Sequence, residues 1–381
     1  MTTKLKIKDA KIETQAVHAG RRIDSSTGAV TPPIHLSTTF ERAPDGKYPL
    51  GFSYAREGNP TRQSLEECLA VLEGGKDALA FSSGMAVATA LLQGLEPGDH
   101  IIAPDDCYYG LRQVIGSVFV KWPLDVTYVD MTNLNALRAA VRPATRLILI
   151  ETPSNPLMKI VDLVAVARLA REANAISVCD GTFTTPVVQR PLNLGVDMVW
   201  HSTTKYMGGH SDMVGGALVT RYDNYLFERA RKSLMFGGMA PSAFDCWLAL
   251  RGLSTLPWRM RAHSANAQAV AEFLQRHPAV ERVYYPGLPE HPGHDIAKQQ
   301  MLGWGGMLSL QTHGDLEAAM AVTGRVELFT RATSLGGPHS LIEHRASIEG
   351  SNTRTPQNLL RMSIGLENSD DLIADLKQAL S

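Results

Sequence analysis

The segment Val196-Asp-Met-Val-Trp-His-Ser-Thr-Thr-Lys-Tyr-Met-Gly-Gly-His210 decides the fold. Its first five residues are mostly apolar and predict a buried strand. A loop rich in hydroxyl groups and glycine follows, and this loop contains a single lysine, Lys205. An isolated lysine is most often a solvated surface residue, so its meaning depends on what the rest of the chain places beside it.

Apolar runs of the same kind alternate with amphipathic stretches between about residues 56 and 245. Near-continuous apolar strands separated by helices indicate a mostly parallel sheet with helices on both faces, so the predicted fold class is α/β. The predicted strands cover 77–81, 100–103, 146–150 and 176–179, and the predicted helices cover 85–92, 133–141 and 163–174.

The chain divides into three predicted regions. Residues 1–55 are irregular, with Pro32-Pro33 and scattered glycines, and predict an extended arm. Residues 56–245 carry the parallel sheet. Residues 246–381 open with a mostly helical stretch, continue with a strand at 306–310, and predict a smaller C-terminal α/β domain.

Composition limits the classes of partner. The 381 residues include 37 Lys and Arg against 38 Asp and Glu, a formal net charge of -1, which argues against a nucleic-acid or membrane-surface protein. No apolar run approaches bilayer length, and the polar N-terminus does not resemble a secretory signal. The 4 cysteines lie far apart in the sequence. We therefore expect no disulfide framework, no metal site, and a cytoplasmic location.

Chemically reactive residues recur directly after the predicted strands, where ligands of an open parallel sheet bind. Ser82-Ser83-Gly84-Met85 opens a helix and suits a phosphate, although alone it is more typical of a plain serine N-cap. Asp180 can cap a helix or meet a cationic ring nitrogen, and Asn155 lies in a turn stiffened by prolines. With Lys205 as a Schiff-base lysine, these are together the groups that pyridoxal 5′-phosphate requires.

Several longer motifs follow one another along nearly the whole chain: Thr14-Gln-Ala-Val-His-Ala-Gly20, Tyr54-Ala-Arg-Glu-Gly-Asn-Pro-Thr61, Phe81-Ser-Ser-Gly-Met85, Glu151-Thr-Pro-Ser-Asn-Pro-Leu157, Ser202-Thr-Thr-Lys205, Ser334-Leu-Gly-Gly337 and Leu359-Leu-Arg-Met-Ser-Ile-Gly-Leu-Glu367. In this order they resemble the Cys/Met-metabolism family of pyridoxal-phosphate enzymes, of fold type I. The resemblance implies that residues 56–245 form the cofactor-binding domain.

The resemblance also implies roles around the cofactor. Lys205 forms the Schiff base, Asp180 pairs with the pyridine nitrogen, and Tyr108 stacks on the ring and acts as an acid. The arm would contribute to the neighbouring subunit, so the active unit would be a dimer within a homotetramer. The other implied cofactor-binding residues are Ser82, Gly84, Met85, Ser202 and Thr204 at the phosphate, Thr182 near the ring, Asn155 by the phenolic oxygen, and Tyr54 and Arg56 at the neighbour's phosphate.

The implied substrate is a small amino acid, whose α-carboxylate Arg361 binds in a bidentate fork. Ser334, Thr333 and Asn155 lie at the same end of the substrate. Thr333 stands where cystathionine γ-synthases and γ-lyases commonly carry glutamate, which weakens a preference for cystathionine.

Four further departures from the family pattern affect the site. Tyr108 is followed by Tyr109 in place of the usual glycine, so either tyrosine could stack on the ring. Gly110 stands where methionine γ-lyases tend to have cysteine. The segment 347–356 is short, and His344-Arg345 replaces a common His-Pro, so substrate scope could differ.

The resemblance favours a transsulfuration enzyme of the cystathionine γ-lyase type, in which γ-elimination gives 2-oxobutyrate, ammonia and a thiol. The alternatives are cystathionine γ-synthase, which replaces the γ-substituent of an activated homoserine, then methionine γ-lyase and cystathionine β-lyase. A different class is a non-catalytic protein that binds pyridoxal phosphate, and intact Lys205, Asp180 and Arg361 argue against it. A nucleotide-binding oxidoreductase is disfavoured because no Gly-x-Gly-x-x-Gly follows the first strand.

Overall fold

The computed structural model describes residues 6–349 and 353–381 of the chain. A seven-stranded sheet lies at its centre, in the order β1-β7-β6-β5-β4-β2-β3. β7 runs antiparallel to both of its neighbours, and the remaining pairs are parallel, so the predicted mostly parallel sheet is confirmed. The strands are β1 (Asp77–Phe81), β2 (His100–Pro104), β3 (Asp125–Val129), β4 (Thr145–Glu151), β5 (Ile176–Asp180), β6 (Met198–His201) and β7 (Gly216–Thr220).

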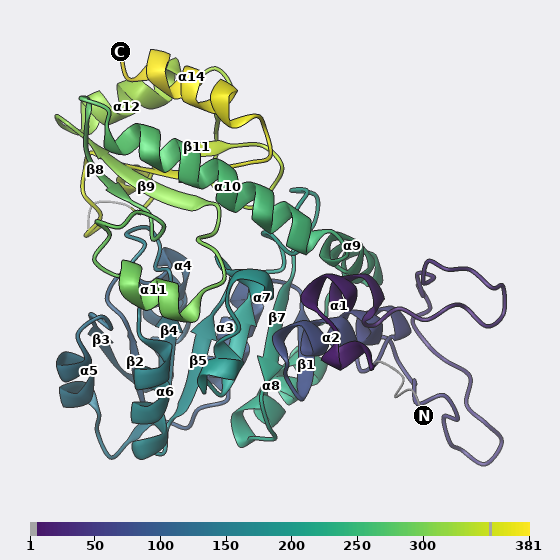
Figure 1. Cartoon of the computed structure of the whole chain (residues 1–381). Helices are drawn as coiled ribbons and strands as arrows, with labels where there is room; N and C mark the ends of the chain where they lie inside the picture. Colours follow the sequence, from purple (N-terminus) through teal and green to yellow (C-terminus); the bar gives the residue numbers. More distant parts are fainter. Residues whose placement is uncertain (1–5, 350–352) are drawn as a thin grey trace, which may run out of the picture.

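Helices cover both faces of this sheet (Figure 1). Side chains alternate between the faces along each strand, so Leu147 and Leu149 of β4 face one layer while Ile148 and Ile150 face the other. Because both faces are buried, the strands are apolar almost throughout. One layer contains α3 (Gly84–Gln93) and α8 (Tyr225–Phe236), and the other contains α2 (Pro60–Glu73), α5 (Leu134–Ala140), α6 (Leu163–Glu172) and α9 (Ala243–Leu253).

The N-terminal part, predicted to be irregular, contains a short 3-10 helix (Ile7–Asp9) and then α1 (Ile12–His18), which packs against α2. Residues 19–59 then form neither helix nor strand, apart from an isolated bridge between Thr39 and Tyr54. Figure 1 shows this stretch looping away from the body of the molecule. Leu36 and Leu50 on it are 76% and 85% exposed, so the stretch contributes little to the core of its own chain.

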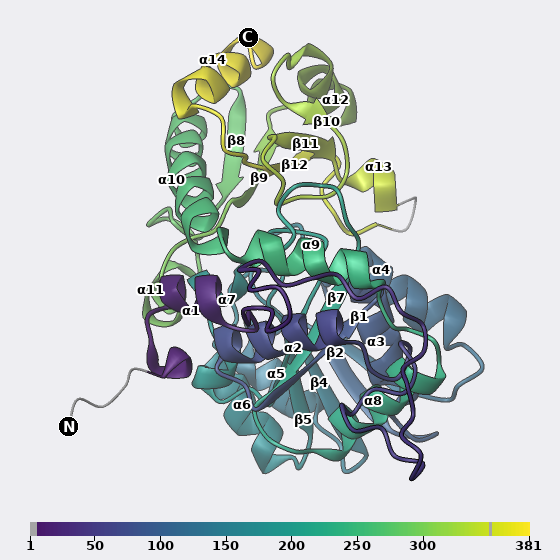
Figure 2. The same cartoon turned by 90° about the vertical axis from the view of Figure 1, so that its right-hand side faces the viewer.

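The C-terminal part contains a five-stranded sheet in the order β10-β11-β12-β9-β8 (Figure 2). Its pairs are antiparallel except that between β10 and β11. Helices pack on one face, and the other face meets the loop after β4, where Ser309 Oγ donates to the carbonyl of Pro156 at 2.8 Å. The elements are α10 (Leu256–Gln275), β8 (Val280–Tyr284), β9 (Met307–Thr312), α12 (Leu316–Arg325), β10 (Thr330–Arg331), β11 (Leu341–His344), α13 (Ala346–Glu349), β12 (Leu359–Ser363) and α14 (Ser369–Ala379).

All four cysteines, Cys68, Cys107, Cys179 and Cys246, are buried and free. Burial raises the pKa of the Cys68 thiol to about 11 and that of Cys246 to about 12. It raises the pKa values of the Cys107 and Cys179 thiols as well. Among the helices of residues 6–349 and 353–381, none is long and apolar enough to cross a membrane.

Candidate active site

A cavity of about 250 Å³ lies at the carboxyl ends of β4, β5 and β6, and residues of β12 and of the segments that flank β11 form its other wall. The strand register brings the ends together, because Glu151 pairs with Asp180 and Asp180 pairs with Trp200. Residues far apart in sequence therefore meet as expected for a parallel sheet. The predicted residues that line the cavity are Gly84, Met85, Tyr108, Asn155, Asp180, Thr182, Ser202, Thr204, Lys205, Thr333, Ser334 and Arg361.

Three predicted residues do not line this cavity. Ser82 lies just outside it, with its backbone N–H donating to the carbonyl of Met239, and Ser83 takes its place in the lining. Tyr54 and Arg56 lie in the N-terminal part, where the Arg56 guanidinium donates to the carbonyl of Met235 and sits 5.6 Å from the ring centre of Tyr54. Their action on a neighbouring subunit stays a prediction.

Lys205 lies in the loop after β6, and its Nζ donates a hydrogen bond to Ser334 Oγ at 2.7 Å. Burial and the positive charge of Arg361 together lower the pKa of Lys205 to about 8, while Glu343 acts in the opposite direction. Near neutral pH an appreciable fraction of this amine is therefore unprotonated, as nucleophilic attack on an aldehyde requires.

The N-terminus of α3 lies against the loop that carries Lys205. A Cβ added to Gly84 would come within 3.0 Å of Ser202 Cβ and 3.2 Å of its Oγ, so only glycine leaves this space open. The backbone N–H groups of the first helical turn are the usual donors to a phosphate. Thr204 Oγ1 is already bonded to the backbone of Gly215, donating to its carbonyl and accepting from its N–H.

Two carboxyl groups lie side by side at the ends of β4 and β5. Burial raises the pKa of Asp180, whose Oδ1 accepts from the backbone N–H of Thr182 at 2.9 Å. Burial and the neighbouring Asp180 also raise the pKa of Glu151. A cationic ring nitrogen beside them would be attracted to this pair. The amine of Lys205, the space at Gly84 and these carboxyls fit pyridoxal phosphate.

Glu151 is a further site residue, to which its sequence motif alone assigned no role. Its two oxygens accept the backbone N–H groups of Tyr108 at 2.8 Å and Asn155 at 2.9 Å, so it fixes two loops of the cavity wall. The signal was present in the sequence, because Glu151 follows an apolar strand as Asp180 does. Both Tyr108 and Tyr109 line the cavity, so the choice between them stays open.

Arg361 lies on β12 and lines the cavity from the C-terminal sheet. Its Nη1 donates to Asn155 Oδ1 and its Nη2 to the carbonyl of Ser334, each at 3.1 Å. It also forms an ion pair with Glu343, the residue opposite it on β11. Burial lowers the pKa of Arg361 to about 10, which leaves it positively charged near neutral pH.

A second cavity, of about 460 Å³, adjoins the first and shares Tyr109 and Asn155 with it. Glu349, Thr353 and Thr355 form part of its wall. These residues belong to the segment 347–356, which is short compared with the family pattern. Residues 350–352 of this segment lie outside the described part of the chain.

Comparison with known proteins agrees with this geometry. A model of the family described as Cys/Met metabolism PLP-dependent enzyme matches residues 13–381. The cystathionine gamma-synthase of Mycobacterium tuberculosis is 50% identical over 373 residues, covering 96% of each chain. The cystathionine gamma-lyase of Dictyostelium discoideum is 45% identical over 378 residues, covering 97% of each chain. The crystal structure of metB from Corynebacterium glutamicum matches with a TM-score of 0.96 and 43% identity, covering 99% of each chain.

The fold and the comparisons together define an enzyme that depends on pyridoxal phosphate. Within that class, the chain belongs to the Cys/Met metabolism family. Its relatives are cystathionine synthases and lyases, which places the chain among the enzymes of transsulfuration.

Proposed function

We propose that this enzyme catalyses γ-elimination on a cystathionine-like amino acid. In this reaction cystathionine and water give cysteine, 2-oxobutyrate and ammonia. The observation that carries the proposal is that the two cavities adjoin and share Asn155 and Tyr109 in their walls. The first cavity contains the lysine and the arginine, and the second offers space for the far half of a two-ended substrate. A short substrate such as cysteine would leave the second cavity empty.

The position of each residue in the cavity suggests its role in the reaction. Pyridoxal phosphate, when bound, supplies an electron sink for the negative charge that develops at the substrate α-carbon. Arg361 holds the α-carboxylate, with Asn155 and the carbonyl of Ser334 fixing its guanidinium. The Lys205 amine removes the α-proton and later a β-proton, which its lowered pKa permits. Tyr108, held by Glu151, donates a proton to the leaving sulfur.

γ-Replacement is the second candidate, because the relative quoted at 50% identity is a cystathionine gamma-synthase. In that reaction the thiol of cysteine replaces the acyloxy group at the γ-carbon of an O-acylhomoserine, giving cystathionine and a carboxylic acid. The same residues would serve, and the second cavity would hold the incoming cysteine. The two reactions differ in whether water or a thiol completes the turnover.

The test is the product formed by the purified, cofactor-loaded enzyme. L-cystathionine alone should release 2-oxobutyrate, detected as its hydrazone, and Lys205→Ala should release none. Pyruvate in place of 2-oxobutyrate would reject γ-elimination in favour of β-elimination. If no keto acid forms, while O-succinyl-L-homoserine and L-cysteine yield cystathionine, then γ-replacement is the activity.

A further inference from the structure

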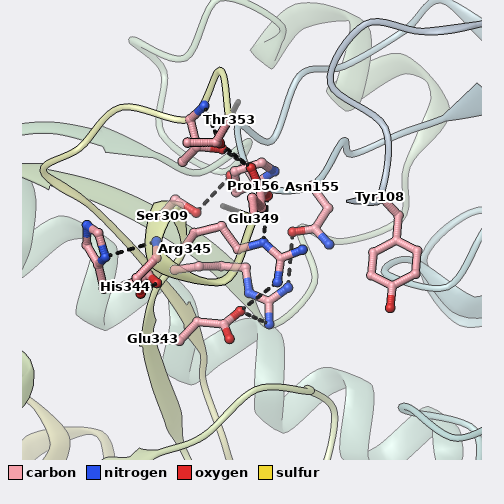
Figure 3. Close-up of polar contacts among 12 residues, drawn as sticks. Tyr108, Asn155, Pro156, Ser309, Glu343, His344, Arg345, Glu349 and Thr353 are labelled. Carbon is pink, nitrogen blue, oxygen red and sulfur yellow. Dashed lines mark hydrogen bonds and ion pairs between the residues drawn. The ribbon is translucent and has the colours of Figure 1, made fainter. Parts of the chain in front are cut away.

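Four charged side chains form a buried cluster at the carboxylate end of the cavity (Figure 3). Two of them, Arg361 and Arg345, line the cavity itself. Glu343 Oε1 accepts from both Arg361 and Arg345, the latter at 3.2 Å from Nη1. Arg345 Nε also donates to Glu349 Oε1 at 2.9 Å. The side chains of Arg361, Glu343 and Arg345 are only 4%, 5% and 3% exposed, so water screens these charges weakly.

The strand register creates this arrangement. Glu343 lies directly opposite Arg361 in the β11–β12 ladder, so the two side chains meet across the strands. Arg345, two residues further along, reaches the same carboxylate oxygen. The other oxygen, Glu343 Oε2, is buried and has no hydrogen-bond partner among the residues that the structure describes. The two guanidinium groups therefore share one acceptor atom.

This sharing matters because Arg361 must hold a further anion. A carboxylate buried with only one arginine would neutralise that arginine. Glu343 paired with Arg361 alone would thus compete with the substrate for the same positive charge. Arg345 changes that balance, since it supplies a second positive charge to the same oxygen.

We propose that Arg345 is a positioning residue of the carboxylate site, which offsets the charge of Glu343 so that Arg361 stays available to the substrate α-carboxylate. Glu343 orients Arg361, and Arg345 prevents Glu343 from neutralising it. The proposal rests on the role proposed above for Arg361. It assigns a role to Arg345, the residue after His344, where the family pattern commonly has proline.

The net charge of the cluster predicts whether each substitution weakens or restores the binding of a carboxylate. Arg361 and Arg345 together balance Glu343 and Glu349, so the cluster is neutral before substrate binds. Arg345→Met leaves one net negative charge facing an incoming carboxylate. Adding Glu343→Gln to that variant removes the negative charge nearest Arg361. Adding Glu349→Gln removes a charge of the same sign that has no ion pair with Arg361.

The experiment measures binding to the cofactor-loaded enzyme from the change in visible absorbance. L-alanine is the probe, because it carries an α-carboxylate but no leaving group, and L-alanine methyl ester is the control without the charge. Arg345→Met should weaken binding of L-alanine about tenfold and leave that of the ester unchanged, as expected for a charged hydrogen-bonded contact. Arg345→Lys should retain most of the affinity.

Double variants give the decisive comparison. Arg345→Met with Glu343→Gln should restore L-alanine affinity to within about threefold of the starting enzyme, whereas Arg345→Met with Glu349→Gln should not. Equal rescue by both, or an unchanged ratio of L-alanine to ester affinity in Arg345→Met, would overturn the proposal. If Arg345→Met does not fold, the ratio of L-alanine to ester affinity is compared instead in Arg345→Lys and in the double variant Arg345→Met with Glu343→Gln.

A separate variant tests the carboxylate role of Arg361, on which the proposed role of Arg345 rests. Arg361→Met should abolish the preference of the enzyme for L-alanine over its ester. If that preference survives, the carboxylate role of Arg361 is wrong and the proposal fails with it. If the preference is lost in Arg361→Met but kept in Arg345→Met, only the role of Arg345 is wrong. Neither result depends on whether the enzyme eliminates at the β- or the γ-carbon.

Discussion

The amine of Lys205 lies among groups that favour its unprotonated form. Burial, with the positive charge of Arg361, lowers its pKa to about 8. Its hydrogen bond to Ser334 holds it at the cavity wall. The reactivity of this lysine thus depends on residues more than one hundred positions away in the sequence, which come from the C-terminal part of the chain.

This gives a prediction about cofactor uptake. Only the unprotonated amine attacks an aldehyde, so the rate at which cofactor-free protein takes up pyridoxal phosphate should rise with pH and level off above about pH 8. An ordinary lysine would keep gaining rate to beyond pH 10. Stopped-flow absorbance measures this, and Arg361→Met should move the midpoint upward. A rate in the unsubstituted protein that still climbs at pH 9.5 would contradict the assignment.

How far the sequence could predict the site depends on the residue. Asp180 and the Lys205 loop follow apolar strands, so the rule that ligands bind at strand ends located them. Glu151 obeys the same rule and could have been found by it. The sharing of Glu343 by Arg361 and Arg345 could not, because it depends on the register of two C-terminal strands and on side-chain rotamers.

Among the helices, α3 matters most for the site, because its first turn lies against the loop that carries Lys205. Ser83 caps the helix, its Oγ accepting from the N–H of Ala86 at 3.0 Å. The plain serine N-cap and the phosphate site are therefore compatible, since the cap occupies one donor of the first turn and leaves others. Periodicity predicted this helix, but the close approach of Gly84 to Ser202 became apparent only in three dimensions.

Gly84→Ala should weaken the binding of pyridoxal phosphate about tenfold or more, because the new methyl group would fill the space beside Ser202. Fluorescence titration of the cofactor-free protein measures the dissociation constant. Gly116→Ala is the matched control, since a Cβ there meets nothing within 4 Å. Equal affinity in the two variants would exclude a phosphate at this helix end.

The end of β4 carries a second prediction at this scale. Glu151→Ala would leave the buried N–H groups of Tyr108 and Asn155 without their acceptor, so unfolding should become easier by about 2 kcal/mol. The apparent midpoint of thermal unfolding reports this. We also expect kcat to fall, because the loop that carries Tyr108 would lose its anchor. A variant with unchanged stability and unchanged kcat would show that neither loop depends on Glu151.

At the scale of the whole molecule, the cavity is assembled from both sheets. The large sheet contributes Asp180 and the lysine loop, and the C-terminal sheet contributes Arg361. The parallel sheet was predictable from the sequence because its strands are apolar on both faces. That pattern is visible within each strand, without knowing which strands lie beside it. Residues 19–59, which include most of the predicted arm, follow no such period, so their place in an assembly cannot be deduced from pattern alone.

Mixing variants tests the predicted sharing of sites between subunits. Lys205→Ala and Arg56→Ala should each be inactive alone, Arg56→Ala through loss of a phosphate contact in the neighbour. Unfolding and refolding them together should restore roughly a quarter of the original activity, because half of the random dimers carry one intact site of two. No recovery on refolding, with the unsubstituted enzyme refolding normally as control, would mean that each chain completes its own site.

The burial of all four cysteines has a consequence for an enzyme of sulfur metabolism. Small thiols such as cysteine are readily oxidised, and their disulfides exchange with any protein thiolate that they can reach. Burial raises the pKa values of these thiols, including that of Cys107, which lines the second cavity, so they present almost no thiolate for such exchange. The molecule can thus work among reactive sulfur compounds without becoming a covalent target of them.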